Sequence, residues 1–155
     1  MQVKEIMSKE VIAVKHSTTL RQLLKIFAKF HMFPLIPVIE ENNRLVGIIS
    51  FRNLINAFRP HELEVLKTVP FLDEKKEDIF KIDLTEEIGN LVVVEDIMEK
   101  NFISIQEETS LEEAFSLMEL HLKEEFPVVD KRGRLMGMIG IFDIIREVFH
   151  QKGVI

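Results

Sequence analysis

The stretch "GIISFRNL", from Gly47 to Leu54, is written again as "GMIGIFDI", from Gly137 to Ile144. In both places an apolar run ends in a small residue, and Asn53 or Asp143 follows three positions later. This pattern predicts a strand that passes into a helix, because apolar residues give way to a residue that favours helix starts. The chain is therefore expected to contain two equivalent strand-to-helix corners.

The similarity extends over most of the chain. Val3–Phe58 aligns with Val94–Phe149, and the offset is 91 residues at first and 90 from the Pro37/Pro127 pair through the Asn53/Asp143 pair. An internal repeat of this length indicates a duplicated structural unit. Each copy alone is too small to bury a comfortable core, so we expect the two copies to pack against each other.

Each copy predicts the order strand, helix, strand, strand, helix. Short apolar strands are expected over residues 11–14 and 102–105, because β-branched and aromatic residues suit a pleated sheet. The spacing of Thr19 with Gln22, and of Ser110 with Glu113, predicts a capping box at the start of each long helix. Behind these caps, apolar residues continue at helical spacing as far as Phe30 in the first copy and Leu122 in the second.

Two further strands and a short helix complete each copy. The turns "ENN" and "KRG" separate apolar strands, and their asparagines and glycine tolerate the positive φ of a tight hairpin. Gly133 is expected in the turn, and Gly137 is expected where another part of the chain approaches the strand closely. The closing helices are "FRNLINAF" and "FDIIREVF".

Composition narrows the possible functions. The 155 residues are 46% hydrophobic and 30% charged, which is typical of a globular protein, and none is cysteine, which excludes disulfides and thiolate chemistry. A net charge of -6 argues against DNA binding. The first residues lack the apolar core of a signal peptide, and no stretch approaches the roughly 20 apolar residues of a membrane span. We expect a cytoplasmic protein with no membrane partner.

The segment between the copies is acidic. Residues 59–93 contain five Lys or Arg against nine Asp or Glu. The stretches "HELEVLKTV" and "KKEDIFKIDLTEEIGNL" have helical patterns, so this connection is expected to be partly helical. Its carboxylates lack the spacing of a calcium loop, which favours a solvated helical face. The expected division is unit 1 over 1–58, the connection over 59–93 and unit 2 over 94–155.

Candidate catalytic and metal-binding residues are few. The sequence has no activated-nucleophile motif and no His pair with metal-ligand spacing. His121 and Glu125 lie four apart and are expected on one helix face, where such a pair is more often solvated than bound to metal. We therefore predict no metal site and no enzyme activity.

The repeated corner has its own chemistry. A small or hydroxyl residue, a carboxylate and the free N–H groups of a helix start suit a nucleotide, because the carboxylate accepts hydrogen bonds from a ribose diol and the helix start favours phosphate. The alternative is structural, since Asn53 and Asp143 would serve equally well as helix caps.

The double pattern "IMS…VIAV…TTLRQLLKIF…PLIPVIEENNRLVGIISFRNLI" and "IME…FISI…TSLEEAFSLM…FPVVDKRGRLMGMIGIFDII" resembles a tandem pair of CBS domains, a Bateman module. The resemblance implies an α+β fold, in which two pseudo-symmetric β-α-β-β-α units pack sheet to sheet in a single compact module. It also implies a regulatory, non-catalytic role, a homodimer, and AMP, ADP, ATP or S-adenosylmethionine as a ligand rather than a cofactor.

The resemblance also implies a set of ligand-binding positions. The family's motif has Thr or Ser followed three positions later by Asp, whereas the first copy has Ser50 with Asn53 and the second has Gly140 with Asp143. Arg52 is expected either to contact a phosphate of the ligand or to be simply an exposed arginine in the first helical turn. The full set is Val14, Ile36, Pro37, Ser50, Arg52 and Asn53 in the first copy, and Ile105, Phe126, Pro127, Gly140, Ile141 and Asp143 in the second.

Two functions are expected to compete. The first is an adenosine-ligand sensor that acts on a regulated protein in trans. The second is a protein-interaction or dimerisation scaffold with degenerate nucleotide sites, which the two incomplete motifs favour. Between the two corners we expect one working site, at Asp143, because a carboxylate makes stronger hydrogen bonds to a diol than an amide does.

Overall fold

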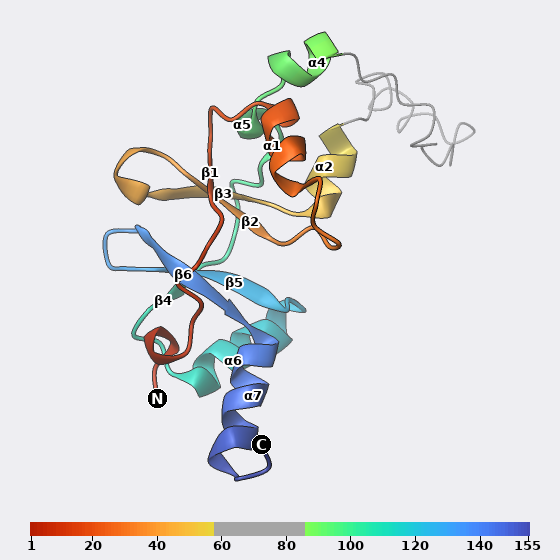
Figure 1. The fold of residues 1–155 in the computed structure, drawn as a ribbon. Helices are drawn as coiled ribbons and strands as arrows, with labels where there is room; N and C mark the ends of the chain where they lie inside the picture. Colours follow the sequence, from red (N-terminus) through yellow and green to blue (C-terminus); the bar gives the residue numbers. More distant parts are fainter. Residues whose placement is uncertain (58–85) are drawn as a thin grey trace, which may run out of the picture.

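Two three-stranded sheets form the centre of the molecule, and helices lie on their outer sides (Figure 1). The structure is a computed structural model that describes residues 1–57 and 86–155. In each sheet the first strand runs parallel to the second, which pairs antiparallel with the third. The strands are β1 (Val14–Lys15), β2 (Ile36–Ile39) and β3 (Leu45–Ile49), and then β4 (Ile105–Gln106), β5 (Glu125–Val129) and β6 (Leu135–Gly140).

The helices follow the predicted order in both copies. The Thr19 hydroxyl accepts the Gln22 N–H at 3.1 Å, and the Ser110 hydroxyl accepts the Glu113 N–H at 3.2 Å, so both helix starts are capped as predicted. The reciprocal bond of a full capping box, from the Thr19 N–H to Gln22 Oε1 at 3.0 Å, is present at the first of these helices and not at the second. The α-helices are α1 (Leu20–Phe27), α2 (Phe51–Ala57), α4 (Glu86–Leu91), α5 (Val94–Ile97), α6 (Leu111–His121) and α7 (Ile141–Gln151), with 3-10 turns η1 (Val3–Glu5) and η2 (Glu41–Asn43).

Some predicted bounds differ from the structure. The first strand of each copy begins at Val14 or Ile105, later than expected, because Val11 and Phe102 pack into an apolar cluster between the two halves. Helix α1 ends before Phe30, and α6 ends at His121, because its C-cap Leu122 has a φ of 53°; the Leu122 side chain is 90% exposed. Apolar residues therefore continue past both helix ends without continuing the helix.

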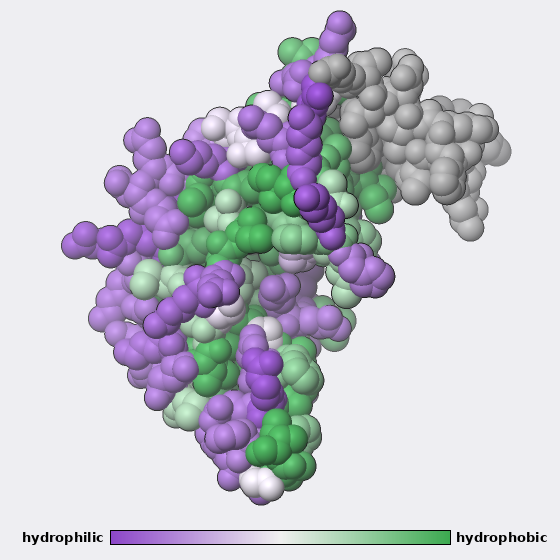
Figure 2. Space-filling view, viewed as in Figure 1, coloured by the Kyte–Doolittle hydropathy of each residue, from purple (hydrophilic) through white to green (hydrophobic). Residues whose placement is uncertain are grey.

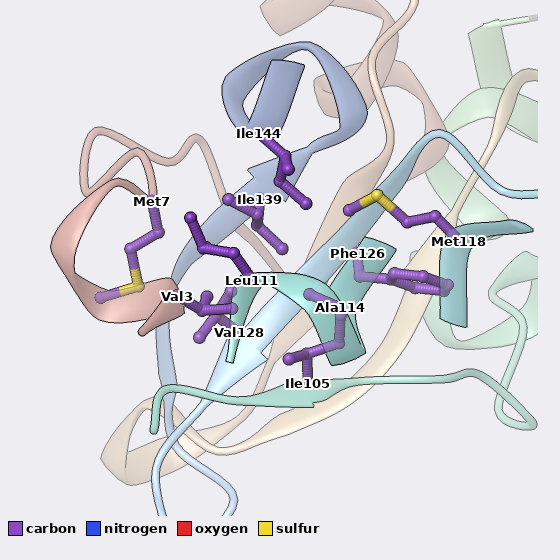
Figure 3. Close-up of a cluster of buried hydrophobic side chains, with 10 residues drawn as sticks. All are labelled: Val3, Met7, Ile105, Leu111, Ala114, Met118, Phe126, Val128, Ile139 and Ile144. Atoms are coloured by element: carbon purple, nitrogen blue, oxygen red, sulfur yellow. The ribbon is translucent and has the colours of Figure 1, made fainter. Parts of the chain in front are cut away.

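The first residues of each copy, 3–8 and 94–99, form a lead that packs against the other copy. Val3 and Met7 are buried among residues of α6, β5 and β6, including Leu111 and Ile139 (Figure 3). In the same way Val94, which opens the second copy, is fully buried in the cluster of the first half. The two leads are thus exchanged, and the core of each half contains residues from both copies of the repeat.

Two glycines of the repeated phrase make this exchange possible. A Cβ at Gly137 would lie 2.5 Å from the Ser8 carbonyl oxygen, and a Cβ at Gly47 would lie 2.6 Å from Met98 Sδ. Ser8 exchanges two backbone hydrogen bonds of 2.9 Å with Met138. The prediction that Gly137 marks a close approach is therefore confirmed, and its neighbour is the lead of the other copy.

The two hairpins meet at one edge of the molecule. Their turns contain Asn42, Asn43 and Gly133 at φ of 62°, 63° and 77°, as these residue types predict. The Leu45 N–H donates to the Gly133 carbonyl at 3.0 Å, and the Asn43 side chain donates to the Leu135 carbonyl at 2.6 Å. These bonds tie the first hairpin to the second.

The acidic connection is described only at its end. Helix α4 falls within the stretch that was predicted to be partly helical. The other stretch, "HELEVLKTV", lies outside the described residues. Within residues 1–57 and 86–155, no helix has the length and apolar character needed to cross a membrane.

Candidate functional site

The second corner is built where β6 ends and α7 begins. Asp143 Oδ2 accepts the Gly140 N–H at 2.8 Å, and Asp143 Oδ1 accepts from the Arg146 guanidinium at 2.6 Å. A carboxylate offers about four lone-pair positions, so each oxygen can accept a further hydrogen bond. Asp143 therefore caps α7 and still has acceptor capacity, and its side chain is partly exposed.

The first corner uses its polar groups internally. Asn53 Oδ1 accepts the Ser50 N–H at 2.8 Å and the Ser50 hydroxyl at 2.9 Å. An amide oxygen has two lone pairs, so both acceptor positions of Asn53 are occupied. The backbone donor also fixes which end of the amide is oxygen. A ribose diol would have to break one of these bonds before it could donate to Asn53.

Glu125 lies beside the second corner, next to Phe126 and Pro127 of the predicted ligand set. It opens β5 and pairs with Gly140 across the sheet, whereas it was expected on a helix face with His121. The α6 helix ends before Glu125 because Leu122 takes the left-handed conformation. In the sequence Glu125 is a charged residue at the start of an apolar strand, where the first copy has Leu35.

Burial and a neighbouring charge perturb Glu125. Its carboxyl is half-buried, and desolvation raises its pKa above the ordinary 4.5, with a smaller upward contribution from Asp143. A hydrogen bond from the Leu35 N–H acts in the opposite direction. Glu125 therefore links Leu35, the residue before β2 of the first half, to the Asp143 corner of the second.

The other predicted site residues have simpler surroundings. Val14, Ile36, Pro37, Ile105, Phe126 and Pro127 are buried, and Ile141 is partly buried. Burial in the core explains why these positions are apolar, whether or not they also contact a ligand. Arg52 is exposed, with its guanidinium 5.9 Å from the ring centroid of Phe51.

Two cavities lie away from both corners. One, of about 700 Å³, lies at the hairpin edge, where Arg44, Arg132 and Arg134 line it. The other, of about 540 Å³, is a groove between α6 and α7 that Phe115 and Val148 help to line. Neither is lined by a residue of the predicted ligand set. Within the part of the chain that the structure describes, no three His, Asp or Glu side chains are grouped to hold a metal ion.

Two sheets made from repeated β-α-β-β-α units, with a cap at each strand-to-helix corner, define a tandem module of the CBS type. The family model for the CBS domain matches residues 3–60 and 94–150. The chain therefore belongs to the CBS-domain family and carries two copies of the domain.

Individual relatives agree with this assignment. A CBS domain-containing protein of Dictyostelium discoideum is 32% identical over 144 residues, which cover 92% of this chain and 88% of that protein. The structure of CBSX2 in complex with AMP superposes with a TM-score of 0.70 at 23% identity, covering 97% of this chain and 98% of that one. The CBS pair of MJ0100, in complex with 5'-methylthioadenosine and S-adenosylmethionine, gives a TM-score of 0.64 at 22% identity and covers 97% and 98%. These two structures establish the tandem CBS fold.

Proposed function

We propose that this protein is a non-catalytic regulatory module that binds an adenosine-containing ligand at the Asp143 corner. The observation that carries the proposal is the remaining acceptor capacity of Asp143, beside the helix start of α7. A ribose diol donates two hydrogen bonds, and charge-assisted bonds to a carboxylate are stronger than neutral ones. The solved CBS pairs that bind AMP, S-adenosylmethionine or 5'-methylthioadenosine support this ligand class.

Only one corner is proposed to bind. Ser50 and Asn53 satisfy each other, so ligand binding at the first corner must first disrupt a helix cap. Ligand at Asp143 would contact the second half near Glu125, whose carboxyl accepts a hydrogen bond from Leu35 of the first half. Binding there can bias the arrangement of the two halves, and a protein in trans would respond to that change.

A thermal-shift panel tests the proposed site. AMP, ADP, ATP, S-adenosylmethionine, 5'-methylthioadenosine and guanine nucleotides are added to the full chain with an extrinsic dye, since the chain has no Trp or Tyr. A ligand that binds the native state raises Tm, and the shift grows with its concentration. We expect at least one adenosine compound to do so and guanine nucleotides not to.

Variants separate ligand binding from helix capping. Asp143→Ala should abolish the ligand-induced shift but also remove the cap of α7. Asp96→Ala is the matched control, because Asp96 accepts the Val93 N–H at 3.1 Å as a cap of α5 and lies at neither corner. The proposal fails if no adenosine compound shifts Tm, or if Asp143→Ala keeps the shift.

We also propose that the chain forms a homodimer through the groove between α6 and α7. Val148 is 39% exposed and Phe149 is 46% exposed there, and Figure 2 shows hydrophobic surface near the C-terminal end of the chain. Burying such side chains against a second copy is favourable. This observation also favours the scaffold function, in which association rather than ligand binding is the activity.

Sedimentation distinguishes these assemblies. We expect a species of twice the 18.1 kDa chain mass at micromolar concentration, and a monomer for Phe149→Asp. Lys131→Asp, on the far hairpin, is the control and should remain dimeric. A wild-type protein that sediments only as a monomer contradicts the dimer, while a dimer without any ligand response supports the scaffold function.

A further inference from the structure

The hairpin edge holds a cavity that the proposed ligand site does not use. Arg44, Arg132 and Arg134 line this cavity of about 700 Å³, together with His16 and the two carboxylates of Glu40 and Glu41. In Figure 2 the edge carrying the hairpin turns is covered by hydrophilic side chains. Three guanidinium groups gather here although the whole chain has a net charge of -6.

Both halves contribute to this cavity in equivalent ways. Arg44 and Arg134 occupy the same position in the two copies and face each other as an antiparallel bridge pair. Like charges placed directly opposite each other are destabilising unless something compensates them. Arg44 Nε lies 3.9 Å from Glu40, so its ion pair is loose. The bridge pair therefore leaves positive charge facing the cavity from both halves.

Arg134 is held rigidly. Asp130 is only 8% exposed, and its carboxylate accepts Arg134 Nε at 2.7 Å and the backbone N–H groups of Arg132 and Arg134 at 2.9 and 3.0 Å. These bonds also hold the pKa of Asp130 below its ordinary 3.8, so the carboxylate stays charged. A guanidinium has five N–H donors, and the Asp130 side chain engages one at Nε, so the terminal nitrogens are available to a ligand.

Arg132 supplies the third cation. Its side chain is exposed and makes no ion pair with any residue in 1–57 or 86–155. The carboxylates of Glu40, Glu41 and Asp130 balance the three guanidinium charges around the cavity, so net charge alone does not favour an anion here. The gathering of three guanidinium groups does favour a phosphate ligand, because guanidinium groups bind phosphate oxygens in paired hydrogen bonds.

We infer that this cavity is a binding site for a phosphate group, held by Arg44 from the first half and by Arg132 and Arg134 from the second. The ligand is inorganic phosphate or a small phosphate monoester, since both present the same oxygens. The site lies at the hairpin end of the strands, whereas Asp143 lies at the helix end of β6. An anion bound between the hairpins would stabilise the contact between the two halves.

Calorimetric titration of the full chain tests the site. Inorganic phosphate and glycerol 3-phosphate are titrated separately at constant ionic strength, which shows whether the free ion or the ester binds better. We expect one saturable site, and Arg44→Gln or Arg132→Gln should weaken it about tenfold or more, as expected for a charge-assisted hydrogen bond. Arg146→Gln, at the opposite end of the strands, is the matched control and should bind as wild type does.

Several results would overturn the inference. One is the absence of saturable binding by wild type for either compound. Another is equal weakening by Arg146→Gln and Arg132→Gln, which would indicate a general charge effect. Asp143→Ala should leave phosphate binding intact, so this site and the adenosine site succeed or fail independently.

Discussion

Asn53 and Asp143 occupy equivalent positions but leave different hydrogen-bonding capacity. The two acceptor positions of Asn53 Oδ1 are filled by Ser50, whereas each oxygen of Asp143 accepts one bond in the described structure. The family resemblance identified both positions from the sequence. The sequence favours the Asp143 corner, because a carboxylate makes stronger hydrogen bonds than an amide. It does not predict that Ser50 fills both acceptor positions of Asn53, because that depends on whether the Ser50 side chain turns toward its own helix.

Replacing Asn53 tests this difference. In Asn53→Asp a carboxylate keeps the cap and adds a second acceptor oxygen near Arg52. We expect AMP to bind this corner at least tenfold more tightly than in wild type, since a charged acceptor strengthens each hydrogen bond. Calorimetry should show a second binding event, and Asn53→Ala should not. Unchanged stoichiometry in Asn53→Asp would contradict the assignment of this corner.

Glu125 gives a prediction about pH. Because the pKa of the Glu125 carboxyl is raised above 4.5 in the folded protein, the folded state holds the carboxyl proton more tightly than the unfolded chain does. The free energy of unfolding therefore falls as pH rises from the unfolded pKa through the folded pKa of Glu125. Glu125→Gln keeps an acceptor for the Leu35 N–H and removes the charge. We expect its Tm to match wild type at low pH and to exceed it at pH 7.

The same variant bears on ligand choice. Glu125 places a second carboxyl beside Asp143, and a phosphate on a bound ribose would be repelled by it within the roughly 10 Å screening length at 0.1 M salt. Glu125→Gln should therefore strengthen AMP binding more than 5'-methylthioadenosine binding. For the pH prediction, a Tm difference between Glu125→Gln and wild type that is equal at every pH would show that the charge of Glu125 does not cause the difference in stability.

At the scale of single elements, starts were predicted better than ends. Thr19 and Ser110 correctly predict where α1 and α6 begin, because capping is a local interaction. The end of α6 was missed, since Leu122 is an ordinary helix-forming residue in a left-handed conformation. The early part of each first strand was misassigned because packing between the halves, which is not local, removes Val11 and Phe102 from the sheet.

Leu122→Gly should stabilise the protein. A non-glycine residue at a φ of 53° carries a steric cost that glycine avoids, and the 90% exposed leucine side chain loses little by removal. We expect a gain of about 0.5–1 kcal/mol, or roughly 1–4 °C in Tm for a chain of this size. Leu122→Ala keeps the Cβ and should give no gain, so an equal gain in both variants would exclude this cause.

At the scale of the whole molecule, the repeat predicted two halves packed sheet to sheet, and the structure confirms that fold. The exchange of the leads was not predictable from the repeat. Val3 and Val94 are apolar and equivalent in either arrangement. The packing of Met7 against Gly137 and of Met98 against Gly47 shows which half each lead completes.

Gly137→Ala tests the exchanged packing. Its new Cβ would lie 2.5 Å from the backbone oxygen of Ser8, so the lead must move, whereas the nearest atom to a Cβ at Gly47 is the flexible Met98 Sδ. We expect Gly137→Ala to cost about 1–3 kcal/mol and Gly47→Ala to cost less, as measured by denaturant unfolding. An equal or reversed order would contradict the described contact.

The exchanged leads also bear on how such a molecule could arise. A single copy of the repeat would lack the residues that Val3 or Val94 supplies, unless it received them from a second identical chain. A single-copy chain would therefore need to form a homodimer with swapped leads, and joining two such subunits into one polypeptide would give the arrangement seen here. The separated halves, 1–57 and 86–155, are accordingly expected to fold when mixed and to remain unstable alone.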